Sequence, residues 1–323
     1  MKVTKVIIII IIIIFLIILK CRNYIYTNSF NELLKLRRKL ERVEGYKKHI
    51  IIDNSNINKY KNNDYFYTLI DSGNIGSKSN SDFYADYLGI KLIEKYYFGK
   101  LKEINIPNDV ENFIIKPYNL SSSQGLLLIK NREDIVQKKK FNSNNEIIKH
   151  YKKNYIKNDE QIIIVQKFIN SKIRPPELKV YSFGGKVGIL NYVKWISETE
   201  RKTAFYTKDW NKFHGDDIKK PSKLIQMIND SNLYTKNLKT FMRIDFLIDE
   251  FTGDYYFCEV SSYPLCANKF FYPSLKIDKY LYNFWKNNFP YNKYSVKEIQ
   301  EKTKHYNKKE LCEKNNFFFS LKN

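Results

Sequence analysis

The sequence has few residues of the types that build disulfide, metal or glycine-rich sites. Only 4 cysteines and 11 glycines occur among its 323 residues. The cysteines have neither the spacing of a zinc site nor that of a disulfide framework, and no internal repeat is present. These absences exclude a zinc module, a disulfide-stapled scaffold and a repeat array. They do not decide the compartment in which the protein works.

Acidic residues are also scarce, with 34 Asp and Glu against 56 Lys and Arg, which gives a formal net charge of +22. Such an excess favours an acidic partner, such as a nucleotide, an anionic glycan, a membrane surface or a nucleic acid. The charge is spread along a chain that is rich throughout in Lys, Asn, Ile and Tyr, so we interpret it mainly as compositional bias. No nucleic-acid-binding motif is recognisable, and no nucleic-acid partner is expected.

The only long apolar run is Val6–Leu19, fourteen residues that are mostly Ile and lie between basic residues. A membrane-spanning helix needs about 20 residues, whereas roughly 7–15 suit the core of a signal peptide. Because no small-residue cleavage site follows, we predict an uncleaved, single-pass signal-anchor over residues 1–22. A cleaved secretory signal is the alternative. Positive charge flanks both ends and is greater on the C-terminal side, which favours a cytosolic catalytic domain.

The rest of the chain divides into three predicted parts. A capping box at Ser29–Glu32 and leucines at helical spacing indicate a stem helix within residues 23–50. With 43% hydrophobic and 16% aromatic residues the chain is expected to fold, and we place the catalytic domain at residues 51–290. Residues 291–323 are rich in Lys and Asn and are predicted to be a basic tail.

Four helical segments are predicted inside the catalytic domain. Asp82–Lys102 is predicted to be helical with aromatic insertions, and Asn131–Asp159 to be an irregular helix or an insertion. Ser222–Leu238 and Phe271–Trp285 are predicted as two further helices, the second closing against a sheet.

A β-hairpin is predicted between the last two helices, with strands at Arg243–Asp249 and Tyr255–Val260. Folded about Thr252, it makes Asp245 and Glu259 direct cross-strand partners, with Cβ atoms about 5 Å apart.

Arg243 and Ser261 share the face of the hairpin that carries Asp245 and Glu259, because side chains alternate along a strand. Two opposed carboxylates repel unless a cation or a proton intervenes, and Mg²⁺ suits such a pair. Arg243 is suited to hold a phosphate or acyl-phosphate oxygen. An ordinary hairpin with solvent-facing acids remains the alternative on this pattern alone.

Earlier segments add candidate nucleotide contacts. Lys116 ends a predicted strand and precedes a polar loop, Tyr118–Gly125, which suits a nucleotide phosphate, although a plain hairpin gives the same pattern. Gln161–Asn170 predicts a buried strand. In the strand that follows, alternation places Glu177 and Lys179 on one face.

In their order along residues 82–285, these segments resemble the TupA-like ATP-grasp family, which is associated with teichuronopeptide synthesis. The hairpin R-I-D-F-L…Y-Y-F-C-E-V-S is similar to the R-x-D, turn, E-x-N metal hairpin of ATP-grasp ligases, with Ser261 in the place of Asn. Tyr263-Pro264 then matches the aromatic-Pro pair of the subgroup. The loop after Lys116 is similar to the family's phosphate flap, and E-L-K-V-Y-S-F-G-G-K to its D-Y-K-F segment.

The resemblance implies an α+β fold with two subdomains whose antiparallel sheets grip ATP. It implies that Asp245, Glu259 and, more weakly, Ser261 hold Mg²⁺, and that Arg243 and Lys179 act as catalytic residues on the transferred group and the phosphates. The implied nucleotide-binding residues are Lys116, Ser121, Ser122, Ser123, Gly125, Gln166, Lys167, Phe168, Ile169, Glu177 and Lys179. Gln166 to Ile169 would form the hinge, with Phe168 packed on the adenine ring.

The implied reaction is ATP-dependent ligation of a carboxylate to an amine through an acyl phosphate. The carboxylate donor and the amine acceptor are unknown, and modification of a surface or secretory glycan is the expectation drawn from the subgroup. The alternative is an inactive nucleotide- or glycan-binding module with the same fold. Ser261 in place of Asn and a phosphate loop with a single glycine support that alternative.

Overall fold

The computed structural model describes residues 78–118, 124–156, 158–197, 199–236, 241–261 and 275–288. The predicted signal-anchor, stem helix and basic tail lie outside these residues. Within the part of the chain that is described, no helix is long and apolar enough to cross a membrane.

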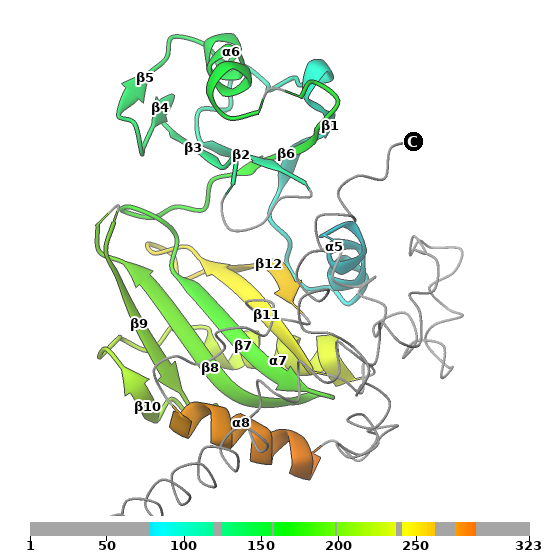
Figure 1. Ribbon diagram of the computed structural model, residues 1–323, viewed down its shortest axis with the longest axis vertical. Helices are drawn as coiled ribbons and strands as arrows, with labels where there is room; N and C mark the ends of the chain where they lie inside the picture. Colours follow the sequence, from blue (N-terminus) through cyan, green and yellow to red (C-terminus); the bar gives the residue numbers. More distant parts are fainter. Residues whose placement is uncertain are drawn as a thin grey trace, which may run out of the picture.

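The smaller subdomain is built on a six-stranded antiparallel sheet of order β1-β6-β2-β3-β4-β5 (Figure 1). Its strands are β1 (Lys95–Lys100), β2 (Phe113–Pro117), β3 (Leu127–Lys130), β4 (Glu133–Asp134), β5 (Lys139–Lys140) and β6 (Ile162–Lys167). A 3-10 turn, η1 (Leu101–Glu103), follows β1. Helix α6 (Asn144–Asn154) begins after Ser143, whose hydroxyl accepts a hydrogen bond from the Glu146 backbone N–H. It packs Ile147 and Tyr151 into the hydrophobic cluster of this subdomain.

The larger subdomain is built on a second six-stranded antiparallel sheet, of order β10-β9-β8-β7-β11-β12. Its strands are β7 (Glu177–Phe183), β8 (Lys186–Trp195), β9 (Arg201–Tyr206), β10 (Lys212–Gly215), β11 (Phe241–Ile248) and β12 (Tyr255–Ser261). The prediction of two subdomains with antiparallel sheets is therefore confirmed.

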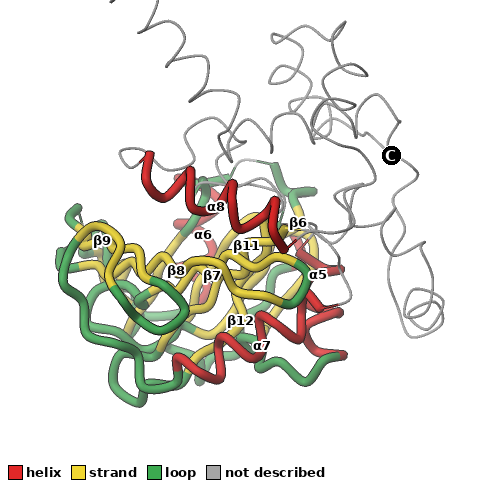
Figure 2. Tube along the Cα trace, turned by 90° about the horizontal axis from the view of Figure 1, so that it is seen from below, coloured by secondary structure: helices red, strands yellow, loops and turns green. Residues whose placement is uncertain are grey.

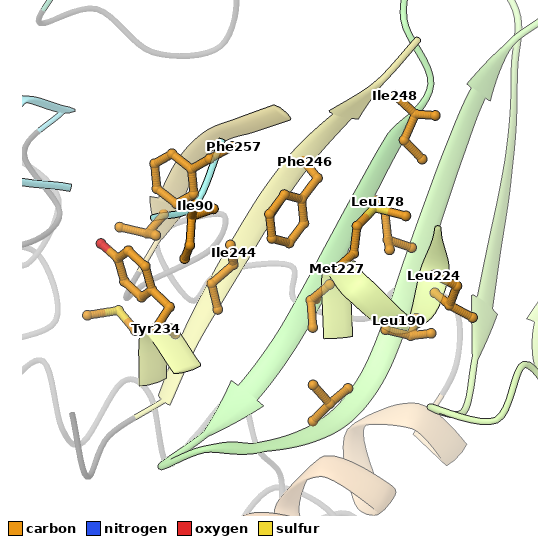
Figure 3. Close-up of a cluster of buried hydrophobic side chains, with 14 of the residues drawn as sticks. Ile90, Leu178, Leu190, Leu224, Met227, Tyr234, Ile244, Phe246, Ile248 and Phe257 are labelled. Atoms are coloured by element: carbon orange, nitrogen blue, oxygen red, sulfur yellow. The ribbon is translucent and has the colours of Figure 1, made fainter. Parts of the chain in front are cut away.

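Helices cover the two faces of the larger sheet differently (Figure 2). On one face lie α7 (Leu224–Lys236) and α5 (Lys78–Tyr87). Figure 3 shows the main cluster on this side, in which side chains from alternate strand positions meet those of α7. Each such apolar side chain contributes about 1.5–3 kcal/mol when it is fully buried.

On the opposite face of the larger sheet, the described residues include one covering helix. Helix α8 (Leu275–Asn288) packs Ile277 and Leu281 against Phe183, Ile189 and other apolar residues of the cluster there. Strand β7 carries Tyr181, Lys179 and Glu177 onward from Phe183 on this same face, because side chains alternate along it. The charged groups therefore lie on the part of this face that α8 does not contact.

The helix predicted over Asp82–Lys102 is wrong beyond Tyr87. Gly89 has φ +74°, a left-handed conformation that ends a helix at little cost for glycine. The chain then forms strand β1, which pairs with β6. Pairing with an apolar strand distant in sequence outweighed the local helical pattern.

Each of the other three segments predicted to be helical contains a helix in the structure. The segment Asn131–Asp159 contains α6, preceded by the short strands β4 and β5. The predictions over Ser222–Leu238 and Phe271–Trp285 are confirmed as α7 and α8, with shifted ends.

Candidate functional site

Strands β11 and β12 form the predicted hairpin, with Asp245 opposite Glu259 and Arg243 opposite Ser261. Nearer the turn the register differs by one residue, since Ile248 pairs with Tyr255. A β-bulge at Cys258 accounts for the shift. If the register of the turn continued without a bulge, Asp245 would lie opposite Cys258, and Glu259 would not face Asp245.

Asp245 is the buried centre of the site, with a side chain only 5% exposed. Both of its carboxylate oxygens accept hydrogen bonds from Arg243, with Nε–Oδ1 at 2.7 Å and Nη2–Oδ2 at 2.6 Å. Lys179 Nζ lies 3.4 Å from Oδ2 and 2.7 Å from Glu177 Oε2. The bidentate pair between Arg243 and Asp245 is both strong and directional, so Asp245 sets the orientation of the Arg243 side chain.

Strand pairing explains why these groups meet. Strand β7 pairs with β11 so that Lys179 lies opposite Asp245 and Tyr181 opposite Arg243. Three neighbouring strands thus present their charges on one face. Burial raises the pKa of Tyr181, and the adjacent Arg243 guanidinium, to which it is hydrogen-bonded, opposes that shift.

The pKa values of the two cations are raised by their acidic neighbours. Burial alone would lower the pKa of Lys179, but Asp245 and Glu177 outweigh it and raise that pKa above its ordinary value. Burial would likewise lower the pKa of Arg243, and Asp245 again reverses the direction. Both side chains are therefore fully charged at neutral pH.

Glu259 is the accessible carboxylate of the pair, with a side chain 44% exposed. Its Oε1 lies 3.6 Å from Arg243 Nη2. Partial burial and the nearby Asp245 raise the pKa of Glu259, while Arg243, Lys116 and Lys179 act in the opposite direction. Carboxylate and hydroxyl oxygens are the donors that Mg²⁺ prefers, so Asp245, Glu259 and Ser261 fit that ion chemically. Among the described residues, no group of three or more His, Cys, Asp or Glu side chains is placed so that it could hold a metal ion by itself.

A narrow crevice with a volume of about 10 Å³ separates the two sheets beside this hairpin. Lys116 and Gln166 line it from β2 and β6, and Phe257 and Cys258 from β12. The charge of Lys116 acts on both Glu259 and Cys258, so this lysine faces the hairpin across the crevice. The structure therefore brings the predicted phosphate lysine to the predicted metal hairpin.

The predicted hinge residues lie in different surroundings. Gln166 is buried and faces the crevice. Phe168 is buried in a cluster with Ile114 and Leu128 and does not line the crevice. Ile169 is also buried, and Lys167 Nζ lies 3.6 Å from a carboxylate oxygen of Glu94.

Of the predicted phosphate loop, Ser121, Ser122 and Ser123 lie outside the described residues. Gly125 has φ +68°, and a Cβ there would come within 2.8 Å of Pro117 Cγ and 2.9 Å of Ile156 Cδ1. Its carbonyl accepts a 2.7 Å hydrogen bond from the Tyr151 hydroxyl of α6. Only glycine fits this position, and it joins the loop to the helix.

Three residues of the site were missed by sequence reasoning. Asp82 and Lys95 line the crevice and form a 2.6 Å ion pair. They lie in the segment predicted as one helix, and the β-favouring aromatic run Tyr96-Tyr97-Phe98 was the signal for a strand that could have placed Lys95. The third residue is Asn191 of β8, which pairs with Lys179 of β7. Its side-chain amide donates a 3.2 Å hydrogen bond to the carbonyl of Ala204.

Comparison with known families identifies the class of protein. The profile of the family described as TupA-like ATP-grasp matches residues 90–286. This match spans more than half of the chain and contains both sheets and the charged hairpin. The chain belongs to the TupA-like ATP-grasp family.

Solved structures of several ligases resemble the chain more distantly. D-alanine–D-alanine ligase from Bacillus anthracis, complexed with ATP, is 16% identical with a TM-score of 0.42, over 73% of this chain and 69% of that one. VanG D-Ala:D-Ser ligase from Enterococcus faecalis is 17% identical with a TM-score of 0.43, over 73% and 62%. L-amino acid ligase from Bacillus licheniformis is 14% identical with a TM-score of 0.39, over 59% and 41%, so the chain spans less than half of that enzyme. No curated protein matches this chain.

Proposed function

We propose that the chain is an ATP-dependent carboxylate–amine ligase that acts through an acyl phosphate. The observation that carries the proposal is the hairpin that pairs Asp245 with Glu259 beside Arg243 and faces Lys116 across the crevice between the sheets. Membership of the TupA-like ATP-grasp family supports it.

The proposed chemistry requires no protein nucleophile. A carboxylate oxygen of the donor attacks the γ-phosphorus of ATP, and the bond from that phosphorus to the ADP oxygen breaks. The amine nitrogen then attacks the acyl carbon of the acyl phosphate, loses a proton, and inorganic phosphate departs. The protein contributes positioning and charge stabilisation, as in other phosphoryl transfers.

Each charged residue has a role in this scheme. Lys116 of the smaller sheet and Lys179 of the larger sheet hold phosphate oxygens, and Arg243 stabilises the charge on the transferred group. Glu259, Asp245 and Ser261 would hold Mg²⁺, which would neutralise phosphate charge when it is bound. Glu259 is the more available ligand, because both Asp245 oxygens already accept from Arg243.

The finer parts of the proposal concern the substrate and the location. We propose a surface or secretory glycan as the molecule modified, on the basis of the subgroup that the chain belongs to. We further propose that residues 1–22 anchor the protein in a membrane in a single pass, with a cleaved signal as the alternative. The apolar run Val6–Leu19 and the basic residues around it support this placement.

One observation favours a second candidate, a binding module without catalysis. The bidentate Arg243–Asp245 pair occupies a carboxylate that the ligase scheme assigns to the metal. Ser261 also provides a weaker ligand than the Asn of related hairpins. A protein of this kind would bind the nucleotide without transferring its phosphate.

The experiment that separates the two candidates measures ATP binding by the full-length protein with and without Mg²⁺, by calorimetry. We expect binding only with Mg²⁺, and ADP formation when the right carboxylate is supplied with hydroxylamine, which traps acyl phosphates. Glu160→Gln is the matched control for carboxylate substitutions in the site, such as Glu259→Gln. Glu160 pairs with Lys100 and Lys102 away from the crevice, so its substitution should leave ATP binding unchanged. A folded protein that ignores ATP contradicts both candidates. Binding without ADP formation across a panel of carboxylates favours the module.

The raised pKa of Glu259 gives a pH dependence of stability with a definite sign. A carboxyl group whose pKa is higher in the folded protein stabilises it fully below the unfolded pKa of about 4.3 and loses that contribution as the pH rises through the raised value. We therefore expect the stability of Glu259→Gln relative to the wild type to increase as the pH rises from about 4.3 through the raised pKa of Glu259. Urea unfolding across that range measures the difference.

The control variant for this experiment, Glu160→Gln, should show a pH dependence of stability with the opposite sign. Lys100 and Lys102 lower the pKa of Glu160 to about 2, so its contribution is present at neutral pH and disappears in acid. Glu160→Gln should therefore lose a small amount of stability relative to the wild type as the pH rises. Parallel pH profiles for the two variants would contradict the placement of Glu259 beside Asp245.

A further inference from the structure

A second hollow lies on the smaller subdomain, between strand β5 and helix α6. Its volume is about 590 Å³, and it opens to solvent. None of its lining residues lines the crevice between the sheets. Figure 1 shows β5 and α6 in the part of the smaller subdomain that is remote from the larger sheet. The hollow is thus a separate feature from the candidate active site.

Positive charge dominates this hollow. Lys139, Lys140, Lys149 and Lys153 line it, with Glu146 as its single acid. The Glu146 carboxylate already accepts a 3.0 Å hydrogen bond from the backbone N–H of Asn142 at the start of α6. Among the described residues, Lys140, Lys149 and Lys153 form no ion pair. Like charges gathered around one hollow repel, and an anion bound there removes that cost.

His150 gives the floor of the hollow a fixed geometry. Its side chain is only 6% exposed. Nδ1 lies 3.0 Å from Asn154 Nδ2 and 3.3 Å from Lys139 Nζ, so the ring accepts from both. Burial, together with Lys139 and Lys153, lowers the pKa of His150 and outweighs the opposing effect of Asp134, whose Oδ2 lies 3.9 Å from Nε2, so the ring stays neutral and able to accept. A buried acceptor therefore holds one of the four lysines at the hollow.

We propose that this hollow binds a ligand that carries phosphate groups with at least two negative charges. Lysine ammonium groups are compact charges that meet phosphate oxygens from several directions, which suits a ring of lysines. The side-chain amides of Gln137 and Asn154 line the same hollow and supply further polar contacts. The proposal does not depend on the ligase chemistry, since it concerns other residues.

The test uses tripolyphosphate as the probe and the ring signal of His150 as the reporter. The chain has only 4 histidines, so proton NMR of the imidazole signals is simple, and His150→Asn assigns the signal. We expect saturable binding that shifts the His150 signal. Lys149→Gln with Lys153→Gln should weaken binding about tenfold or more, because two charge-assisted contacts are lost.

The matched control removes the same charge elsewhere on the subdomain. Lys152 and Lys102 are paired with Asp159 and Glu160, and neither lines the hollow. Lys102→Gln with Lys152→Gln should leave the affinity within about twofold of the wild type, since exposed pairs contribute little.

Vesicles that contain phosphoinositide separate the two sources of such a ligand. A His150 shift with tripolyphosphate supports a soluble ligand, and a shift with these vesicles alone supports a lipid headgroup; both agree with the proposal. Equal weakening in the two double variants would show general attraction by a chain of charge +22 and would overturn it. Tripolyphosphate binding with an unmoved His150 signal would place the probe in the active site and would also overturn it.

Discussion

Replacing Asp245 with Asn is expected to abolish Mg²⁺-dependent ATP binding and to destabilise the protein by about 3 kcal/mol. Arg243 depends on both Asp245 oxygens, and its own side chain is only 12% exposed. The substitution leaves this cation without its charged partner in a buried position. Calorimetry with Mg²⁺ and ATP measures the loss of binding, and urea unfolding measures the loss of stability.

Glu259→Gln separates the two effects of Asp245→Asn. Glu259 lies opposite Asp245 but is far more exposed, and it lies 3.6 Å from Arg243 without a bidentate contact. We expect Glu259→Gln to lose Mg²⁺-dependent binding without the loss of stability that is expected for Asp245→Asn. If Asp245→Asn proves as stable as the wild type, the assignment of a buried, stabilising Arg243–Asp245 ion pair is wrong. If Glu259→Gln binds Mg²⁺ and ATP normally, the metal assignment is wrong.

Lys179→Met is expected to weaken ATP binding about 100-fold, because removing one member of a buried charge cluster costs about 2–5 kcal/mol. Lys179 Nζ bridges Glu177 at 2.7 Å and Asp245 at 3.4 Å. Without it the two carboxylates lose a shared cation, and the phosphates lose one of their contacts. Titration of ATP with Mg²⁺ present gives the change in affinity.

Two further variants make the Lys179 experiment specific. Lys179→Arg keeps the charge and should recover part of the affinity. Lys194→Met removes a lysine from the neighbouring strand β8, where it pairs with Glu250 at 2.8 Å, and should leave ATP binding unchanged. Equal losses in Lys179→Met and Lys194→Met would mean that net charge, and not the position of Lys179, controls binding.

Local pattern was sufficient to predict the elements that carry the site. Alternation along β11, β12 and β7 predicted which side chains share a face, because a strand repeats every two residues whatever it packs against. The same argument failed for Asp82–Lys102, where helical and strand patterns compete. Pairing with β6 decided that segment, and Asp82 and Lys95 were missed as a result.

The cross-strand pair of carboxylates was predicted correctly, but the prediction did not include the β-bulge that produces this pair. A hairpin folded about Thr252 gives Asp245 opposite Glu259, but the pairs nearest the turn follow another register. The bulge at Cys258 restores the predicted pair. Bulges add a residue to one strand only, and nothing in the local pattern of this hairpin indicates where that residue falls.

The sequence by itself determined the order of the motifs, the faces on which their side chains lie and the family to which the chain belongs. These depend on strand periodicity and on residue types at short spacing, which are local properties. Only the tertiary structure decided that Arg243 holds both oxygens of Asp245, that Lys116 faces Glu259 across a crevice and that four lysines surround His150. Arg243 and Asp245 lie two residues apart on one strand, but the orientation of their side chains depends on the neighbouring strands. The other contacts join residues of different elements, and only the packing of the sheets and helices brings those elements together.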